Sequence, residues 1–371
     1  MGQSFSQFII TQGFRQNMWM FTCKIGHFIG IIKTPAKLNI KDRPPSQAPA
    51  INYHFSRKCN YECGFCFHTA KSSDKLSLMD AKKLISQLAQ AGFKKMNFAG
   101  GEPFLPDHTG KDNYLGEMVK HASEVGFESV SIISNARYIK EEWMEKYSQY
   151  LDMLGVSCDS ADDTTNAKIG RGKNGDHTKH IKRAAQLCEK YHIMFKLNTV
   201  VNKFNYNEDM TELVNEIKPS RWKIFQVLGV EGENNGRGAK TDVSEFFITD
   251  EQFTAYVKRH KESIEFPEIM KVEDNNTMQS SYVLVDEKGR FLDCSQGGKQ
   301  PTKPILEVGV EQAWGEIVSS PGGGFDQQAF LRRGGVFDWT RSDRLNHQKN
   351  ACCSSSGGGG GVDIEDLAGK N

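Results

Sequence analysis

Residues 52–68 read NYHFSRKCNYECGFCFH, and within them Cys59, Cys63 and Cys66 lie at the spacing Cys-x3-Cys-x2-Cys. Zinc sites and most iron–sulfur sites take four protein ligands, so three neighbouring thiols leave one position open. Three thiolates on a [4Fe–4S] cluster would leave one iron free to bind a small molecule. The alternative is a structural zinc loop that borrows a distant cysteine or His68 as its fourth ligand.

The composition limits the class of protein that carries this motif. With 371 residues, of which 38% are hydrophobic and 25% charged, the chain is typical of a soluble enzyme and not of a disordered or fibrous protein. A formal net charge of +1 argues against a nucleic-acid-binding protein, which usually carries a strong basic excess. The nine cysteines are odd in number, and Cys158, Cys188 and Cys294 stand alone. This pattern favours a metal site in a reducing, cytoplasmic compartment over a secreted disulfide framework.

Downstream of residue 50, apolar strand candidates alternate with amphipathic helices. This rhythm predicts an α/β protein with a parallel sheet and right-handed crossovers. The polar motifs follow or end strand candidates, and in a barrel or partial barrel that edge of the sheet carries the active site. The strand candidates are 51–55, 95–99, 129–134, 152–157, 194–201 and 221–228, and the helix candidates are 77–91, 113–125, 139–149, 177–191 and 207–217. Later segments are a helix near 249–263, a hairpin at 282–294 and a helical segment at 305–318.

Shifts in composition divide the chain into four parts. Residues 1–45 carry six basic residues against a single acid, and their apolar stretch 17–32 is too short to span a membrane. This segment is predicted either to lie in a membrane interface or to be a disordered leader, and its opening MGQSFS fits a myristoylation pattern. The barrel is predicted over 46–230, a C-terminal extension over 231–345 and a disordered Gly/Ser-rich tail over 346–371.

A second motif lies at the end of the second strand candidate. Residues 98–103 read FAGGEP, in which the glycines let the backbone approach a ligand and Glu102 offers a hydrogen-bond acceptor. The two motifs, in this order and on consecutive strands, resemble the signature of the radical SAM superfamily. The resemblance implies a [4Fe–4S] cluster on Cys59, Cys63 and Cys66, whose open iron binds the amine and carboxylate of S-adenosyl-L-methionine (SAM).

Over residues 50–345 the likeness narrows to the viperin family of antiviral radical SAM enzymes. The stretches that carry it include NYHFSRKCNYECGFCFHTAK, NFAGGEPF, SCDS, FKLN, RWKIFQ, EGEN and RRGG. The resemblance implies a partial (βα)6 TIM-like barrel whose C-terminal extension closes the substrate site. It also implies the reaction. A 5′-deoxyadenosyl radical abstracts the 4′ hydrogen of a ribonucleoside triphosphate. The 3′ hydroxyl then leaves as water, and one electron and one proton complete a 3′-deoxy-3′,4′-didehydro nucleotide that terminates viral RNA chains.

The residues themselves make sense for a triphosphate. Lys196 lies within an otherwise apolar strand, and Arg221 and Lys223 share one face of the next strand because they are two residues apart. Buried cations of this kind need an anion, and a triphosphate carries about four negative charges. The alternative is that these lysines are surface residues at strand edges. The nucleotide positions implied by the family are Lys95, Lys196, Asn198, Arg221, Lys223 and Arg333.

The resemblance also implies the SAM contacts. Arg171, in the stretch IGRG, suits the SAM carboxylate because its guanidinium is a fork-shaped donor. Tyr282 matches a tyrosine proposed in the family as the hydrogen or proton source, and a half-buried hairpin aromatic is an equal alternative. The implied SAM positions are Phe65, Gly101, Glu102, Ser134, Ser157 and Arg171.

The sequence leaves the base open between CTP and UTP, because phosphate contacts are common to all nucleotides. Besides the nucleotide, the expected partners are a reductant or electron-transfer protein, the iron–sulfur assembly machinery and a membrane surface, at the cytosolic face of the endoplasmic reticulum or of lipid droplets. The chain departs from animal viperins at its end, where Asn371 closes a glycine-rich tail in place of a terminal tryptophan. Two alternatives remain. One is another radical SAM enzyme, such as a cofactor-forming cyclase or a peptide maturase, and the other is a non-catalytic membrane-surface protein with a structural cluster.

Overall fold

The computed structural model describes residues 50–106, 113–278, 281–320 and 325–339. Contacts divide the chain into two units, and all the described residues belong to the second, Pro44–Asn371. The predicted N-terminal segment and the predicted Gly/Ser-rich tail lie outside the described residues. None of the described helices is long and apolar enough to cross a membrane.

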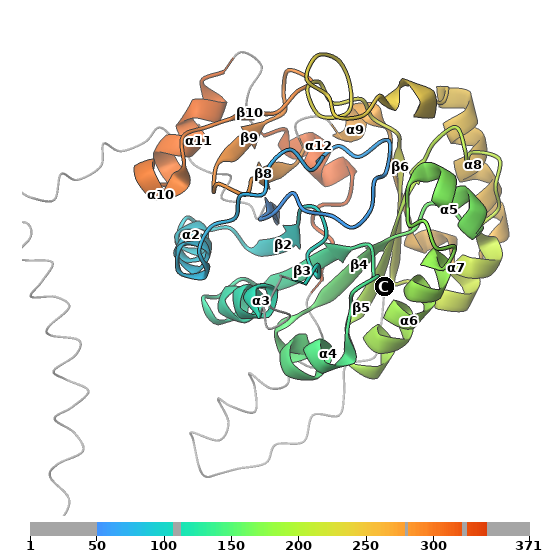
Figure 1. Ribbon diagram of the computed structural model, residues 1–371, viewed down its shortest axis with the longest axis horizontal. Coiled ribbons are helices and arrows are strands. Elements are labelled where there is room, and N and C mark those ends of the chain that lie inside the picture. The colour runs from blue at the N-terminus through green and yellow to red at the C-terminus, as the bar shows by residue number, and fades with distance from the viewer. Residues whose placement is uncertain (1–49, 107–112, 279–280, 321–324, 340–371) are drawn as a thin grey trace, which may run out of the picture. The chain divides into compact units, whose positions relative to one another are not determined.

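A curved sheet forms the centre of the described unit (Figure 1). Its six central strands run parallel in chain order, as the sequence predicts, and each is joined to the next by helical crossovers. The strands are β1 (Ala50–His54), β2 (Lys95–Ala99), β3 (Ser129–Ser134), β4 (Met153–Ser157), β5 (Met194–Val201) and β6 (Arg221–Gln226). The crossover helices are α2 (Leu78–Gln90), α3 (Tyr114–Glu124), α4 (Glu141–Tyr147), α5 (Asp163–Ile169), α6 (His177–Lys190) and α7 (Thr211–Ile217).

The crossover helices cover the outside of the sheet. Ser77 caps α2 with its side chain, and the helix then turns one apolar face to the core. The buried residues on that face are Ala81, Leu84, Ile85 and Leu88. Figure 1 shows α2, α3, α4, α6 and α7 following one another around the sheet. The hydrophobic core therefore lies between the helices and the sheet, and the inner face of the sheet is left for polar side chains.

The C-terminal extension adds strands to both edges of the sheet. β7 (Met270–Glu273) pairs with β6, and β8 (Val283–Val285) pairs with β1 at the opposite edge. Only residues 274–282 connect these two strands, a span of at most about 35 Å. The sheet must therefore curl until its edges approach each other, and Glu273 indeed contacts Tyr282, which directly precedes β8. This curvature makes the predicted partial barrel.

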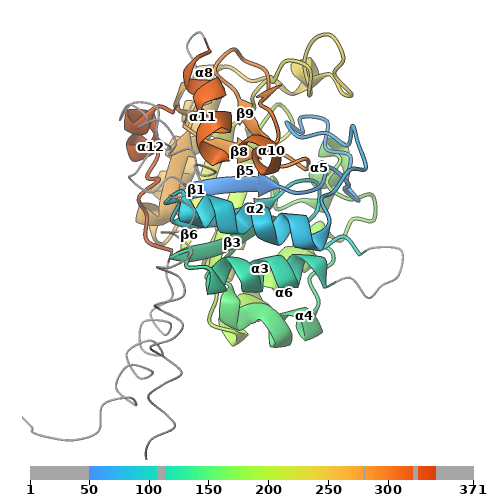
Figure 2. The ribbon, with the colours of Figure 1, turned by 90° about the vertical axis from the view of Figure 1, so that its left-hand side faces the viewer.

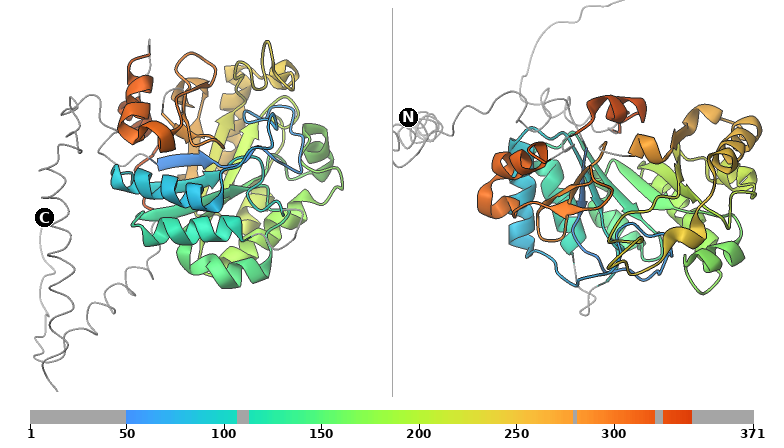
Figure 3. Two further views of the ribbon diagram at one scale, coloured as in Figure 1. Left: turned by 60° about the vertical axis from the view of Figure 1, so that its left-hand side comes forward. Right: turned by 90° about the horizontal axis from the view of Figure 1, so that it is seen from above.

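The rest of the extension consists of a hairpin, several helices and a short edge strand. The predicted hairpin is present, since β8 pairs antiparallel with β9 (Phe291–Asp293). Figure 3 shows α10 (Ile305–Val308) and α11 (Val310–Val318) beside this hairpin. In Figure 2 the arrow of β1 points away from α12 (Gln327–Arg332), which lies where the strands begin. The remaining elements are α8 (Asp250–Ser263), α9 (Asn275–Met278) and β10 (Gln300–Pro301). The sequence did not predict α5, β7, α9, β10 or α12.

The strand register decides which side chains share a level inside the barrel. Lys196 on β5 is paired with Arg221 on β6. One level nearer the carboxyl ends of the strands, Asn198 is paired with Lys223 on one side and with Ser157 on the other. Neighbouring strands lie about 4.8 Å apart, so side chains at one level are adjacent. Asn198 therefore lies between the predicted SAM side, at Ser157, and the predicted nucleotide side, at Lys223.

Candidate active site

The cysteine loop follows β1 and rests on the end of α5. The backbone N–H of Glu62 donates to the Gly170 carbonyl at 3.2 Å. Gly170 has a left-handed φ of +94°, and a Cβ added to it would lie 2.3 Å from the Glu62 carbonyl oxygen. Only glycine permits this approach. The end of α5 thus fixes the backbone of the loop that carries the three thiols.

The three thiols lie close enough to influence one another's ionisation. Burial raises the pKa of Cys63 to about 12, and the neighbouring thiols of Cys66 and Cys59 add to the shift. The Tyr61 N–H donates to the Cys59 Sγ at 3.4 Å, and the His68 N–H partly offsets the rise that burial causes in the pKa of Cys66. No three Cys, His, Asp or Glu side chains in the described ranges are arranged to hold a single metal ion. A cubane cluster takes each thiolate on a different iron, so three neighbouring thiols with N–H donors fit a [4Fe–4S] cluster.

The second motif packs directly on the cysteine loop. The Gly101 N–H donates to the Ser56 carbonyl and the Glu102 N–H to the Lys58 carbonyl, both at 2.8 Å. A Cβ on Gly101 would lie 1.9 Å from the Lys58 oxygen. Glycine is therefore required here for two backbones to pair, whatever ligand binds beside them.

Glu102 is a buried acceptor at the carboxyl ends of the strands. It accepts hydrogen bonds from the Ser134 hydroxyl at 2.6 Å, the Asn135 N–H at 2.7 Å and the Phe104 N–H at 3.0 Å. Burial raises the pKa of Glu102 to about 7, although these donors oppose the rise. Such a carboxylate is oriented by its neighbours and suited to an incoming ammonium group. The Ser134 hydroxyl contacts Glu102 in this structure, so it acts through that carboxylate.

Arg171 forms a buried ion pair with Asp159, a residue that the sequence analysis did not single out. Burial alone would lower the pKa of Arg171, but the Asp159 carboxylate holds it above its usual value. The guanidinium lies 5.6 Å from the centre of the Phe65 ring, and that ring packs on Phe246 with 5.8 Å between centroids. Two predicted SAM positions, Phe65 and Arg171, are thus in contact.

Ser157 is linked to the cysteine loop through His177. The His177 Nε2 lies 2.9 Å from the Ser157 carbonyl oxygen, and its Nδ1 lies 3.3 Å from the Tyr61 hydroxyl. Burial lowers the pKa of His177 to about 3, so the ring is neutral, with Nε2 donating and Nδ1 accepting. The end of β4 is thereby fixed relative to the loop between Cys59 and Cys63.

Five basic side chains gather inside the barrel. Burial lowers the pKa of Lys196 well below its usual value, and the positive charges of Lys223, Arg221 and Arg333 add to the effect. Burial also lowers the pKa of Lys95, and the charges of Arg221 and Arg333 add to that effect, so the five groups form one cluster. All five are less than a tenth exposed: Lys95, Lys196, Arg221, Lys223 and Arg333. The alternative that the lysines are surface residues is therefore wrong.

Several polar atoms of this cluster have no partner in the described part of the protein. Arg221 donates through Nη2 to the carbonyls of Arg333 and Gly334, at 3.2 and 3.1 Å, while its Nε and Nη1 are buried and unpaired. The Nε of Arg333 and the Oδ1 of Asn198 are also buried and unpaired. Buried polar groups in native proteins are normally paired, so the three guanidinium nitrogens indicate a ligand with acceptor oxygens, and the Asn198 oxygen indicates a donor such as a hydroxyl group on the same ligand.

The segment after α12 covers the end of the barrel where the strands begin. The Lys95 Nζ donates to the Phe337 carbonyl at 2.5 Å. The Trp339 ring centre lies 5.3 Å from the Lys95 Nζ and 5.6 Å from the Lys196 Nζ. This segment therefore contacts the cation cluster on the side away from Glu102.

Tyr282 lies at the centre of a buried polar group. Its hydroxyl donates to Glu273, which also forms an ion pair with Lys223. The Lys223 Nζ lies 3.3 Å from the Tyr282 oxygen, and the Arg333 guanidinium lies 3.7 Å from the centre of the tyrosine ring. Burial lowers the pKa of Lys223 to about 8 and raises that of Tyr282 well above its usual value.

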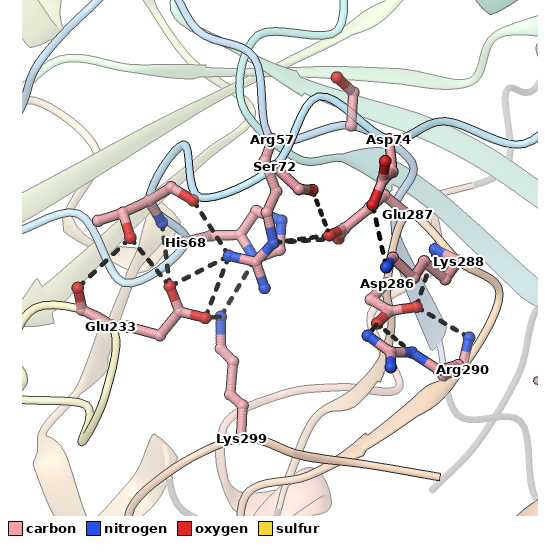
Figure 4. Close-up of polar contacts among 12 residues, drawn as sticks. Arg57, His68, Ser72, Asp74, Glu233, Asp286, Glu287, Lys288, Arg290 and Lys299 are labelled. Atoms are coloured by element: carbon pink, nitrogen blue, oxygen red, sulfur yellow. Dashed lines mark hydrogen bonds and ion pairs between the residues drawn. The ribbon is translucent and has the colours of Figure 1, made fainter. Parts of the chain in front are cut away.

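A second buried network ties the cysteine loop to the C-terminal extension (Figure 4). Arg57 donates through Nε to Glu287 at 3.0 Å and through Nη1 to Glu233 at 3.1 Å. Lys299 donates to the Phe67 carbonyl at 2.6 Å and lies 3.8 Å from Glu233. Two cations and two carboxylates balance one another here, so the network needs no further ligand. It connects both ends of the loop to the extension, through Arg57 before the cysteines and Phe67 after the last of them.

The functional residues missed by sequence reasoning are mostly carboxylates. Asp159 and Glu233 lie within the stretches SCDS and EGEN, so their motifs were noticed but their roles were not. Glu273 lies in the short sequence MKVE, which gives no signal of an inner barrel face. Each becomes recognisable only through the cation that it pairs with in the folded protein.

The barrel, the thiol loop and the paired glycine loop define the protein as a radical SAM protein, and residues 53–217 match the Radical SAM superfamily. The chain belongs to the viperin family of S-adenosylmethionine-dependent nucleotide dehydratases. It is 43% identical to the S-adenosylmethionine-dependent nucleotide dehydratase RSAD2 of Oncorhynchus mykiss, over 83% of this chain and 87% of that protein. It is 34% identical to the S-adenosylmethionine-dependent nucleotide dehydratase of Flammeovirga pacifica, over 78% of this chain and 96% of that protein.

Solved structures agree on the fold. Streptococcus suis SuiB bound to S-adenosylmethionine is similar with a TM-score of 0.52, over 77% of this chain and 68% of that chain, at 17% identity. As a member of the radical SAM superfamily, the protein uses a [4Fe–4S] cluster and SAM as cofactors. The roles of the individual residues in binding SAM and the nucleotide remain predictions from the sequence.

Proposed function

We propose that the protein is a radical SAM nucleotide dehydratase that acts on a pyrimidine ribonucleoside triphosphate, CTP or UTP. The observation that carries this proposal is the buried cation cluster, in which Arg221 and Arg333 keep unpaired guanidinium nitrogens. Buried cations in excess of their counter-charges cost free energy, so a site that gathers five of them around one buried carboxylate is suited to a polyanion. Relatives that match most of the chain are nucleotide dehydratases by name.

The charge of the cluster suits a triphosphate. If all its members are ionised, the five cations and the Glu273 carboxylate sum to about +4, close in size to the charge of a nucleoside triphosphate. A monophosphate would leave several buried cations uncompensated. These contacts recognise only the phosphate groups, which CTP and UTP share, so the choice between the two nucleotides depends on other residues.

Cys59, Cys63 and Cys66 would hold the [4Fe–4S] cluster, which when bound would supply the electron that cleaves SAM to a 5′-deoxyadenosyl radical. The residues of the chain hold the reactants. Glu102 accepts the SAM amine, and Arg171 donates to the SAM carboxylate. A triphosphate on Lys196 and Arg221 leaves the ribose one level higher, at Asn198, which the register places beside Ser157.

The reaction removes one water from the ribose. The 4′ hydrogen is abstracted, the 3′ hydroxyl leaves as water, and one electron and one proton complete a 3′-deoxy-3′,4′-didehydro nucleotide. This product lacks a 3′ hydroxyl and therefore terminates an RNA chain, which is the basis of an antiviral role.

The protein also needs partners. The electrons come from a reductant or electron-transfer protein, and the [4Fe–4S] cluster comes from the iron–sulfur assembly machinery. The basic, aromatic segment before residue 45 suits attachment to the cytosolic face of the endoplasmic reticulum or of lipid droplets.

Anaerobic turnover tests the proposal. The reconstituted protein is incubated with SAM and dithionite, and with each of the four ribonucleoside triphosphates in turn. We expect one pyrimidine triphosphate to stimulate 5′-deoxyadenosine formation and to yield a nucleotide lighter by one water. SAM cleavage that no triphosphate stimulates would contradict the substrate but keep the superfamily chemistry. A protein with an intact cluster and no SAM cleavage at all would support the non-catalytic alternative.

A further inference from the structure

Glu273 is a buried carboxylate in direct contact with the cation cluster. It is fully buried, and its two oxygens accept from the Lys223 ammonium and the Tyr282 hydroxyl. The Lys223 Nζ and the Tyr282 oxygen are themselves 3.3 Å apart. Lysine, carboxylate and phenol therefore form a closed triangle, in which movement of any one group changes the partners of the other two.

The strand register places this triangle beside the expected ribose. Glu273 is paired with Phe225, which lies two residues after Lys223 on β6. Phosphates on Lys196 and Arg221 occupy a lower level, nearer to the start of the strands. The Glu273 carboxylate thus lies between the phosphate level and the carboxyl ends of the strands, where Glu102 lies. A carboxylate at this height faces the sugar and not the end of the phosphate chain.

The nucleotide changes the electrostatics around this carboxylate. In the nucleotide-free protein, burial alone would raise the pKa of Glu273, but the charges of Lys223 and Arg333 hold it below its usual value. The charged and titratable groups that face it are Lys223 and Arg221 from β6, Lys196 from β5, Tyr282 before β8 and Arg333 after α12. A triphosphate competes for Lys223 and brings about four negative charges close to a buried carboxylate. Both changes favour the protonated form of Glu273.

We propose that Glu273 is the proton store for the dehydration step: the bound triphosphate draws Lys223 away, Glu273 takes up a proton, and Tyr282 passes that proton to the leaving 3′ hydroxyl. This inference rests on the proposed function, because it needs a triphosphate and a ribose in the barrel. Tyr282 touches the substrate in this scheme, and Glu273 acts through Tyr282. Glu273 is therefore a positioning and proton-holding residue.

The step balances in atoms and charge. The 3′ oxygen takes the phenolic proton of Tyr282, and the C3′–O bond breaks with both electrons on oxygen, so that water leaves. The sugar, which carried a neutral radical at C4′, becomes a radical cation. One electron from the external one-electron reductant then forms the C3′=C4′ double bond. The proton on Glu273 then moves to the Tyr282 oxygen and restores the phenol. Glu273 is left ionised, and Lys223 pairs with it again when the product leaves.

Proton uptake can be measured without turnover. The cluster-loaded protein, without reductant, is titrated with CTP and with UTP at pH 8 in buffers of different ionisation enthalpy. For whichever nucleotide binds, we expect wild type to take up more protons than Glu273→Gln, by about half to one proton per nucleotide. Glu273 also raises the pKa of Lys223, so in Glu273→Gln this lysine gains more proton on nucleotide binding than in wild type, and a difference in favour of wild type is a lower limit for the carboxylate. Asp338→Asn is the control, because it removes an exposed negative charge that raises the pKa of Lys95, whereas the negative charge that raises the pKa of Lys223 is that of Glu273. Equal uptake in wild type and Glu273→Gln would overturn the proposal.

Product ratios give a second, independent test. We expect Glu273→Gln to form 5′-deoxyadenosine in response to the nucleotide at close to the wild-type rate, while the didehydro product falls at least about tenfold. Glu273→Asp should restore part of the coupling because it keeps the proton-binding group. A merely structural role would lower both products together, and that result would overturn the proposal. If wild type itself shows no nucleotide-stimulated SAM cleavage, the proposed function fails first, and that result is visible before any variant is compared.

Discussion

Arg171 and Asp159 form a buried ion pair beside the cysteine loop, and Asp159 is itself anchored by the Val200 N–H at 2.9 Å. The guanidinium is therefore oriented by the protein before a ligand arrives. A fork-shaped donor can serve Asp159 with one edge and a second carboxylate with the rest of its N–H groups. This makes Arg171 a pre-positioned partner for the SAM carboxylate.

We expect Arg171→Lys to weaken SAM binding at least about tenfold, because a lysine cannot bridge two carboxylates with the same geometry. The measurement is equilibrium binding of SAM to the cluster-loaded protein without reductant. Arg290→Lys is the matched control, since Arg290 also pairs with an aspartate, Asp286, but in the hairpin of the extension. Equal SAM affinity in wild type and Arg171→Lys would contradict the assignment.

Gly101 offers a test of the backbone pairing between the two motifs. A Cβ at this position would lie 1.9 Å from the Lys58 carbonyl oxygen, so Gly101→Ala must separate the loops. We expect a loss of about 2–4 kcal/mol in unfolding free energy and a lower iron content. Gly315→Ala is the control, because no atom lies within 4 Å of its added Cβ and the residue is in α11. Alanine there should be neutral or stabilising by about 0.5–1 kcal/mol.

Lys196 predicts a conflict between stability and function. Burial and neighbouring cations lower the pKa of Lys196 well below the usual value, so a charged lysine at this position destabilises the folded protein unless an anion is bound. We expect Lys196→Met to raise the melting temperature while it weakens triphosphate binding at least about tenfold. The control is Lys94→Met, which removes an exposed surface partner of Glu128 and should change neither quantity much. A variant that loses both stability and binding would show that Lys196 is mainly structural.

The sequence predicted most of the barrel because its strands are apolar runs of five to eight residues bounded by helices. It did not predict β7, whose sequence MKVE is short and half polar, because an edge strand added by the extension needs no apolar run. The same contrast holds in the site. Lys196 stands out between apolar neighbours, whereas Asp159 and Glu273 look like ordinary surface acids until their cations are placed beside them. Pairing across distant segments is a tertiary property, and one strand alone does not reveal it.

Glu102 makes SAM binding depend on pH. Burial raises its pKa to about 7, well above the value of about 4.3 in an unfolded chain. Between these two pKa values the folded state therefore keeps a proton on Glu102 that the unfolded chain has lost. The stability that this proton contributes is present at low pH and is lost as the pH rises through 7. The SAM amine needs the ionised form, so we expect affinity to fall up to about tenfold per pH unit below 7. In Glu102→Gln the weak binding should be independent of pH over this range. A wild-type affinity that is constant from pH 6 to 8 would exclude this role.

Glu233 tests whether the C-terminal extension supports the cluster. Its carboxylate accepts from the Arg57 Nη1 at 3.1 Å and from the Thr69 N–H at 3.2 Å, on the two sides of the cysteine loop. Glu233→Gln leaves the Arg57 charge only partly compensated, and breaking one side of a buried ionic network costs about 3–5 kcal/mol. We expect the variant to lose iron and sulfide after reconstitution and to show a weaker electron paramagnetic resonance signal of the reduced cluster. Glu231→Gln, an exposed glutamate two residues earlier, is the control and should keep both. If Glu233→Gln retains full iron content and an unchanged spectrum, the cysteine loop is held by the barrel alone, through α5 and the loop of Gly101.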